Sequence, residues 1–333
     1  MTEPLWQLQN VMLESAGVIR LDAASLSIRP GVTAVIGYSG AGKTSLLNLL
    51  AGLEQPTRGT VTQALPLHGA ARSNPRMPLY WVPQDGGLWP HWSVRRHLNA
   101  VCPHPQTAKN DGKTQDSTDN LLNQFDLLHR QHAFPGDLSM GERSRLSVAR
   151  SLAAEPGVLV MDEPLAHVDT VRRPRYWNVI REHLKQNQTS LVFSTHEPET
   201  AVSESEWAVC LSGGRVLHCG PTMQLYHQPP SEEAGLFLGP VNWFTQQDAA
   251  RWLQAEYASP AAFRAEAVDL IGDDDTDLRI RSFRFHGSFA ETVVEHIPTS
   301  SQRTIVHRPT GTTCQVGQNV RIAVTSHAEG ECR

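Results

Sequence analysis

Residues 37–44 read Gly37-Tyr38-Ser39-Gly40-Ala41-Gly42-Lys43-Thr44, between the apolar run VTAVI (Val32–Ile36) and the leucine-rich stretch Ser45–Leu53. The apolar run has the character of a buried strand and the leucine-rich stretch that of a helix, so the octet is a strand-to-helix turn. It fits the pattern GxxxxGK[ST], whose glycines allow backbone N–H groups to turn inward beside the positive end of a helix dipole. The sequence therefore predicts a phosphate-binding loop.

Side chains of this loop have distinct expected roles. Lys43 is expected to reach the β- and γ-phosphates of a nucleotide, and Thr44 to coordinate Mg²⁺ through its hydroxyl. The predicted nucleotide contacts of the segment are Gly37, Ser39, Gly40, Ala41, Gly42, Lys43, Thr44 and Ser45.

An acidic pair follows a second apolar run, Val158–Met161. In open α/β sheets ligands bind at the carboxyl ends of the strands, so Asp162 and Glu163 are expected beside the phosphate-binding loop. Asp162 suits Mg²⁺, in direct contact or through water, and Glu163 suits a general base that polarises the attacking water.

The chain is predicted to have an α/β fold with a parallel sheet. Apolar runs of strand length recur at Ser190–Ser194 and Trp207–Leu211, with intervals long enough for helices. The polar stretch from Cys102 to Asp119 is predicted to be a solvated loop within a helical insertion.

The last part of the chain has a different pattern. After Gly239-Pro240 the segments Leu278–Phe285 and Val320–Ser326 alternate with period two, which predicts a small β domain. We expect one domain over residues 1–239, with its helical part at about 90–150, and a second domain over 240–333.

Composition excludes several classes of protein. A formal net charge of -5 with 19% charged residues does not favour binding to a nucleic-acid backbone. No run approaches the ~20 apolar residues needed to span a bilayer, so we expect a soluble chain whose role at a membrane depends on a partner. The five cysteines are scattered without metal-ligand spacing, as expected of idle thiols in a reducing compartment.

The segment Leu138–Glu142, Leu-Ser-Met-Gly-Glu, resembles the LSGGQ signature of the ABC (ATP-binding cassette) ATPases. The resemblance continues in the family's order with Gln84 in VPQD, Asp169 in LAHVD and His196 in STHEPE, and it covers about the first 240 residues. Ser139 and Gly141 also begin a predicted helix, which makes a second anion-binding helix start. Its apolar residues at helical spacing are Leu146, Ala149, Leu152 and Ala153.

The resemblance implies an ATPase with ATP and Mg²⁺ as cofactors, and a head-to-tail dimer with a second copy of the chain. Ser139 and Gly141 of one copy would face the γ-phosphate held by the other, and Asp169 would lie across the interface. The catalytic roles implied are those of Glu163, His196 and Gln84, and the metal ligands implied are Thr44, Gln84 and Asp162.

The resemblance further implies an importer. Residues 85–94 are similar to the segment through which importer ATPases contact transmembrane permease subunits, and Leu88, Trp89 and Trp92 are expected to form that contact; the alternative is that the tryptophans pack under the helical insertion. Such a subunit lies peripherally on the cytoplasmic face of the membrane and works indirectly with an extracellular or periplasmic solute-binding protein. The segment Phe263–Val268 resembles part of the C-terminal barrel domain of importers for oxyanions, ferric iron, polyamines or sugars.

Several positions depart from the family pattern. Met140 and Glu142 replace a glycine and the glutamine of the signature, and a bulky Met140 is expected to slow closure or hydrolysis. His167 is unusual beside Asp169, and residues 7–36 contain no aromatic side chain to stack on adenine.

Two other functions fit parts of the sequence. One is a soluble mechanochemical ABC ATPase, which the lack of paired cassettes, heptads or a basic face does not favour. The other is a ligand-sensing regulatory module with a weakened cassette. The presence of Lys43, Asp162, Glu163 and His196 argues against such a loss of activity.

Overall fold

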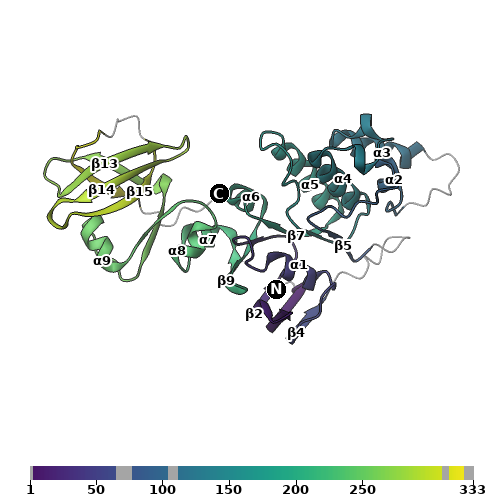
Figure 1. Ribbon diagram of the computed structural model, residues 1–333, viewed down its shortest axis with the longest axis horizontal. Helices are drawn as coiled ribbons and strands as arrows, with labels where there is room; N and C mark the ends of the chain where they lie inside the picture. The colour runs from purple at the N-terminus through teal and green to yellow at the C-terminus, as the bar shows by residue number, and fades with distance from the viewer. Residues whose placement is uncertain (1–2, 65–76, 104–111, 310–314, 326–333) are drawn as a thin grey trace. The chain divides into compact units, whose positions relative to one another are not determined.

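The structure is a computed structural model that describes residues 3–64, 77–103, 112–309 and 315–325. The chain divides into two compact units, residues 1–222 and 223–333 (Figure 1). The sequence interpretation placed the boundary after residue 239 instead. The difference arises because helices α7 (Thr222–His227) and α8 (Glu232–Leu236) are joined to the second unit by the hydrogen bonds of Arg264 described below.

A six-stranded sheet with the order β5-β6-β7-β3-β8-β9 forms the centre of the first unit. Its strands are β5 (Leu79–Val82), β6 (Val158–Met161), β7 (Ser190–Thr195), β3 (Val32–Ile36), β8 (Trp207–Ser212) and β9 (Arg215–Pro221). The first five run parallel, which confirms the predicted α/β sheet, and β9 adds an antiparallel edge. Strands β6 and β7 are buried along their whole length, as the continuous apolar runs require.

Helices α1 (Lys43–Leu50), α5 (Arg173–Asn187) and α6 (Pro198–Glu204) accompany this sheet. Helix α1 packs against β6 and β7 through buried leucines, and α6 packs against β3 and β7. Because β3, β6 and β7 are neighbours, the loops after these three strands meet at one edge of the sheet.

A separate antiparallel sheet with the order β2-β1-β4 was not predicted from the sequence. It consists of β1 (Trp6–Ser15), β2 (Val18–Ile28) and β4 (Arg58–Gln63), with a loop of positive-φ residues at Ala16 and Gly17 between the first two strands. Trp6 is completely buried in the core that this sheet shares with α1.

Helices α2 (Val94–Asn99), α3 (Gly112–Gln124) and α4 (Met140–Ala153) pack together as a helical part (Figure 1). Short turns at 128–130 and 135–137 lie between α3 and α4. The predicted solvated loop from Cys102 to Asp119 is wrong for residues 112–119, which belong to α3, while residues 104–111 lie outside the described part. Buried Leu122 and Phe125 anchor the end of α3, and helix propagates cooperatively from such a packed turn into polar residues.

The second unit is a small β domain, as predicted. Its strands are β10 (Val241–Phe244), β11 (Ala261–Arg264), β12 (Val268–Gly272), β13 (Leu278–Phe285), β14 (Ala290–His296), β15 (Ser301–His307) and β16 (Val320–Val324). They form one three-stranded and two two-stranded antiparallel sheets, preceded by α7 and α8 and interrupted by α9 (Gln246–Asp248) and a π-turn at 249–253.

Arg264 ties the two helices to the β strands of this unit. Arg264 is 4% exposed, and its guanidinium donates to the carbonyl oxygens of Tyr226, Gly235 and Gly239 at 2.9, 3.0 and 2.7 Å. The guanidinium also lies 4.3 Å from the centre of the Tyr226 ring, whose hydroxyl donates to Glu266. Burial, together with the Glu266 carboxylate, raises the pKa of Tyr226 to about 12, so the phenol keeps its proton. The segment Phe263–Val268, which contains Arg264 and Glu266, therefore ties the helices of this unit to its strands.

Replacement of Arg264 by Met should loosen the second unit. The buried carbonyls would lose their donor at a cost of about 3 kcal/mol, which corresponds to roughly 100-fold faster amide exchange. Hydrogen exchange of the full chain, read by mass spectrometry over residues 223–309, measures this. The control Arg284→Met removes an exposed arginine and should leave exchange unchanged; equal effects of the two substitutions would contradict the assigned tie.

Candidate active site

The backbone of the phosphate-binding loop needs glycine at two points. Gly37 has φ +153 and a Cβ there would lie 2.3 Å from the carbonyl oxygen of Leu211. Gly42 has φ +101 and a Cβ there would lie 2.5 Å from the carbonyl oxygen of Arg20. Both approaches are to backbone, which cannot yield, so the loop is held tightly against β8 and β2.

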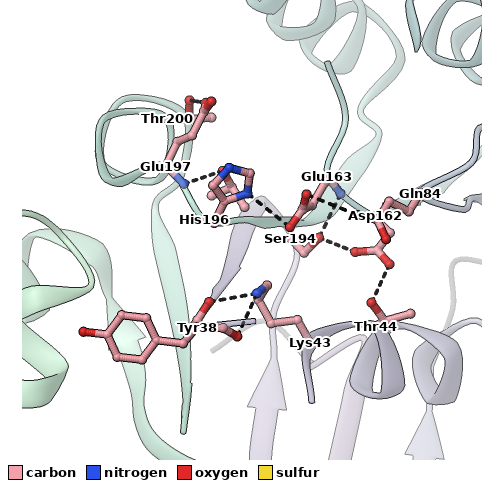
Figure 2. A network of polar contacts seen from close by, with 12 residues as sticks. Tyr38, Lys43, Thr44, Gln84, Asp162, Glu163, Ser194, His196, Glu197 and Thr200 are labelled. Atoms are coloured by element: carbon pink, nitrogen blue, oxygen red, sulfur yellow. Dashed lines mark hydrogen bonds and ion pairs between the residues drawn. The ribbon is translucent and has the colours of Figure 1, made fainter. Parts of the chain in front are cut away.

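Lys43 lies at the centre of the loop. Its ammonium donates to the carbonyl oxygens of Gly37 and Tyr38 at 2.8 and 3.2 Å, and the residue is only 8% exposed (Figure 2). The Tyr38 ring points away from the ammonium. The curled loop therefore surrounds a single positive charge, which is the arrangement that attracts phosphate.

Asp162, at the end of β6, joins three elements. One carboxylate oxygen accepts from the hydroxyl of Thr44 in α1 at 2.7 Å, and the other accepts from the hydroxyl of Ser194 in β7. Hydroxyl and carboxylate oxygens are the ligands Mg²⁺ prefers, so the pair Thr44 and Asp162 fits that ion. Among the described residues no three His, Cys, Asp or Glu side chains gather as a metal site.

Glu163 has an unusual backbone. Its φ is +49, a left-handed conformation that costs a non-glycine residue roughly 1–2 kcal/mol. The N–H of Glu163 donates to Ser194 Oγ at 2.8 Å, which stabilises this conformation. The carboxylate then lies 3.2 Å from His196 Nδ1 and 3.4 Å from Gln84 Nε2 (Figure 2).

Ser194 is a site residue that the sequence reasoning missed. It is completely buried, and its single hydroxyl donates to Asp162 while accepting from Glu163. Its position at the end of a predicted strand, two residues before His196, is the signal that could have identified it.

The signature residues lie elsewhere and line a cleft. Ser139 caps α4: its hydroxyl accepts from the N–H of Glu142, whose carboxylate accepts from the N–H of Ser139 at 2.8 Å. This cleft of about 390 Å³ is lined by Ser139, Gly141, Glu142, Arg145, His167, Val168, Asp169, Arg172 and Tyr176. None of the residues of the phosphate-binding loop lines it.

Leu88, Trp89 and Trp92 lie in a third place, beside α2. Trp89 is 39% exposed and its ring centre lies 4.5 Å from that of the half-buried Trp92. Leu88 is also half-buried. Both tryptophan rings therefore reach the surface, and we call the group formed by Trp89, Trp92 and the buried His97 the tryptophan cluster.

The structure thus brings Lys43, Thr44, Asp162, Glu163, His196 and Gln84 together at one edge of the sheet. It holds Ser139, Gly141 and Asp169 together elsewhere. A phosphate-binding loop, an acidic strand end with a histidine beside it and a capped signature helix together define a nucleotide-hydrolysing cassette.

Comparison with known proteins identifies the family. The family described as ABC transporter matches residues 21–166. The Fe(3+) ions import ATP-binding protein FbpC of Yersinia pestis bv. Antiqua is 30% identical over 253 residues, 72% of this chain and 69% of its own length. The spermidine/putrescine import ATP-binding protein PotA of Treponema pallidum is 31% identical over 68% of this chain and 59% of its own length. This chain belongs to the ABC transporter family, as an ATP-binding subunit of the importer type and an ABC-type ATPase.

Solved structures agree on the fold. An ATP-binding cassette solved as a dimer with ADP and phosphate superposes with a TM-score of 0.54 at 21% identity, over 65% of this chain and 98% of its own length. An ATP-binding subunit of an ABC transporter gives a TM-score of 0.56 at 21% identity, over 67% and 92%. In the part of this chain that the structure describes, no helix is long and apolar enough to cross a bilayer.

Replacement of Ser194 by Ala should lower ATP hydrolysis about 10- to 100-fold, because Asp162 and Glu163 both lose the hydroxyl that positions them. The Mg²⁺ concentration for half-maximal activity should rise as well. Steady-state phosphate release at varied Mg²⁺ measures both. Ser190→Ala, at the other end of β7, is the matched control and should stay within about two-fold of the parent; a Ser194 variant with normal kinetics would exclude the positioning role.

Proposed function

We propose that two copies of this chain pair head to tail and bind two ATP molecules between them. The phosphate-binding loop of one copy would hold the triphosphate, and Ser139 and Gly141 of the second copy would contact its γ-phosphate. The observation that carries this proposal is that the two half-sites lie apart in one chain, because no residue of the phosphate-binding loop lines the cleft of the signature residues. Asp169 lines the signature cleft and would take part in the same interface.

In the proposed reaction Glu163 is the general base that polarises water for attack on the γ-phosphate. His196 and Gln84, both in contact with its carboxylate, orient it, and Lys43 balances phosphate charge. Thr44 and Asp162 would hold Mg²⁺, which when bound would stabilise the negative charge that develops on the phosphate. Gln84 uses its Nε2 to contact Glu163, and its amide oxygen would be the third Mg²⁺ ligand from the chain.

The tryptophan cluster and Leu88 form the proposed contact with the transmembrane permease subunits, which places the chain at the cytoplasmic face of the membrane. The rings of Trp89 and Trp92 lie next to each other at the surface. Tryptophan is among the residues most enriched at the centres of protein interfaces. The cassette itself does not select the solute in this proposal, because relatives named for ferric ions, spermidine/putrescine and sulfate/thiosulfate match it at 30, 31 and 33% identity.

Replacement of Glu163 by Gln should lower ATP hydrolysis by at least about 100-fold, since the general base is lost while ATP binding persists. With ATP and Mg²⁺ the variant should accumulate as a dimer, which size-exclusion chromatography with light scattering detects. Glu182→Gln makes the same change at an exposed glutamate of α5 and should behave as the parent. Normal turnover in the Glu163 variant would remove the residue from its role, and a monomer at saturating ATP would refute the paired site.

Replacement of Trp89 and Trp92 by Ser should release the chain from membranes. When the chain is co-expressed with its permease subunits, we expect the membrane-bound fraction to fall at least ten-fold, because the buried aromatic area of the contact is lost. The fraction is measured by sedimentation of membranes and immunoblotting. The control Phe285→Ser removes an aromatic that is 64% exposed in the second unit and should leave the fraction unchanged; retention of the double variant would refute the contact.

A further inference from the structure

Arg150 is a buried cation that the proposed reaction does not use. It lies in α4, the helix that Ser139 caps, and it is 3% exposed. No carboxylate pairs with it among the described residues, and burial lowers the pKa of its guanidinium. A buried charge without a counterion is costly, so its presence in α4 calls for an explanation.

The guanidinium holds the turn that follows Gln84. Its two terminal nitrogens donate to the carbonyl oxygens of Gly86 and Gly87 at 2.9 and 2.8 Å. Both glycines have positive φ, and a Cβ at Gly86 would lie 3.2 Å from the Cβ of Ser147 in α4. The turn is therefore pressed onto the signature helix and fastened there by one side chain.

The same guanidinium holds the tryptophan cluster. It lies 4.6 Å from the centre of the Trp89 ring, which stacks on His97 at 5.4 Å. The backbone N–H of Trp89 donates to His97 Nε2 at 2.9 Å, and His97 Nδ1 donates to the carbonyl oxygen of Ser93 at 2.8 Å. Since Nε2 accepts a hydrogen bond, His97 is neutral, in agreement with the burial that lowers its pKa.

We propose that Arg150 is a positioning residue that couples the signature helix to the tryptophan cluster. Nucleotide-driven closure would move α4, and Arg150 would carry the turn at Gly86 and Gly87 and the ring of Trp89 with it. This coupling rests on the proposed function, in which closure engages Ser139 and the cluster contacts the permease. Gln84, which lies just before the turn that Arg150 holds, contacts Glu163 directly.

The chemistry of arginine suits this task and that of lysine does not. A planar guanidinium can donate to two neighbouring carbonyl groups and stack on an aromatic face at the same time. A lysine ammonium is a point charge on a flexible chain, so it keeps the positive charge while losing the two-pronged geometry. Arg150→Lys therefore separates the geometry from the charge.

The test uses the full chain with Glu163→Gln, which retains ATP. Hydrogen exchange over residues 86–98 should slow at least five-fold on addition of ATP and Mg²⁺. In the double variant with Arg150→Lys, the ATP-dependent dimer should still form while the slowing over 86–98 is lost. The control Arg95→Lys changes a partly buried arginine of α2 that binds Gln131 and Asp119, and it should keep the response.

Three results would overturn the coupling: no ATP response over 86–98 in the Glu163→Gln parent, a full response with Arg150→Lys, or an equal loss with Arg95→Lys. A purely structural role of Arg150 would change exchange with and without ATP alike. If Arg150→Lys does not fold, Trp89→Leu serves instead and should abolish the response at 92–98 while keeping it at 86–87. Failure of the proposed function is distinct, because the parent would then remain monomeric at saturating ATP.

Discussion

The carboxylate of Asp162 is the constraint on which the active site depends. It is 3% exposed and bonded on one side to Thr44 and on the other to Ser194, so it joins the phosphate-binding helix to two strands of the sheet. The strand order β6-β7-β3 makes this possible, because it places the carboxyl ends of these three strands side by side. The hydroxyl of Ser194 also fixes the left-handed backbone of Glu163, so the proposed metal ligand and the proposed base are positioned by one buried group. A change in the sheet register at this edge would displace both together.

Much of this edge could be predicted from the sequence, because its signals are local. A buried strand, a glycine-bearing turn and a helix succeed one another at Val32–Leu50, and the acids stand directly after an apolar run. The sheet β2-β1-β4 was missed because its period-two pattern is broken: the pairing of β1 with β2 shifts register repeatedly, and Asn10 and Ala23 have positive φ. Ser194 was overlooked although its place at the end of a predicted strand is a local signal. Arg150 could not be assigned from the sequence because it acts through residues far away in the chain. The polar start of α3 was misread because tertiary packing of its other end overrides local propensity.

The two glycine positions of the signature respond differently to substitution for a geometric reason. At position 140 a methionine is tolerated within the chain, since its side chain is 60% exposed. At position 141 a Cβ would lie 2.9 Å from the carbonyl oxygen of His167, so only glycine lets the segment that carries Asp169 approach the helix. The methionine therefore adds bulk only to the surface that is proposed to meet the second copy. Gly141, in contrast, is needed to form the cleft within each copy.

Glu142 places a negative charge at the N-terminus of α4, where the proposed function requires a phosphate to bind. Burial raises the pKa of this carboxyl, but the hydrogen bonds from Ser139 and the charges of Arg130 and Arg145 outweigh it, so the pKa lies below its usual value and the group is ionised at neutral pH. An ionised cap binds the N–H of Ser139 more strongly than a neutral amide would and is favoured by the helix dipole. Arg130, 3.4 Å away, and Arg145 in the same cleft offset the added charge. The N-terminus of α4 can therefore keep the stronger cap without repelling an anion. In this chain Arg130 and Arg145 contribute to the anion-binding character of the signature together with Ser139 and Gly141.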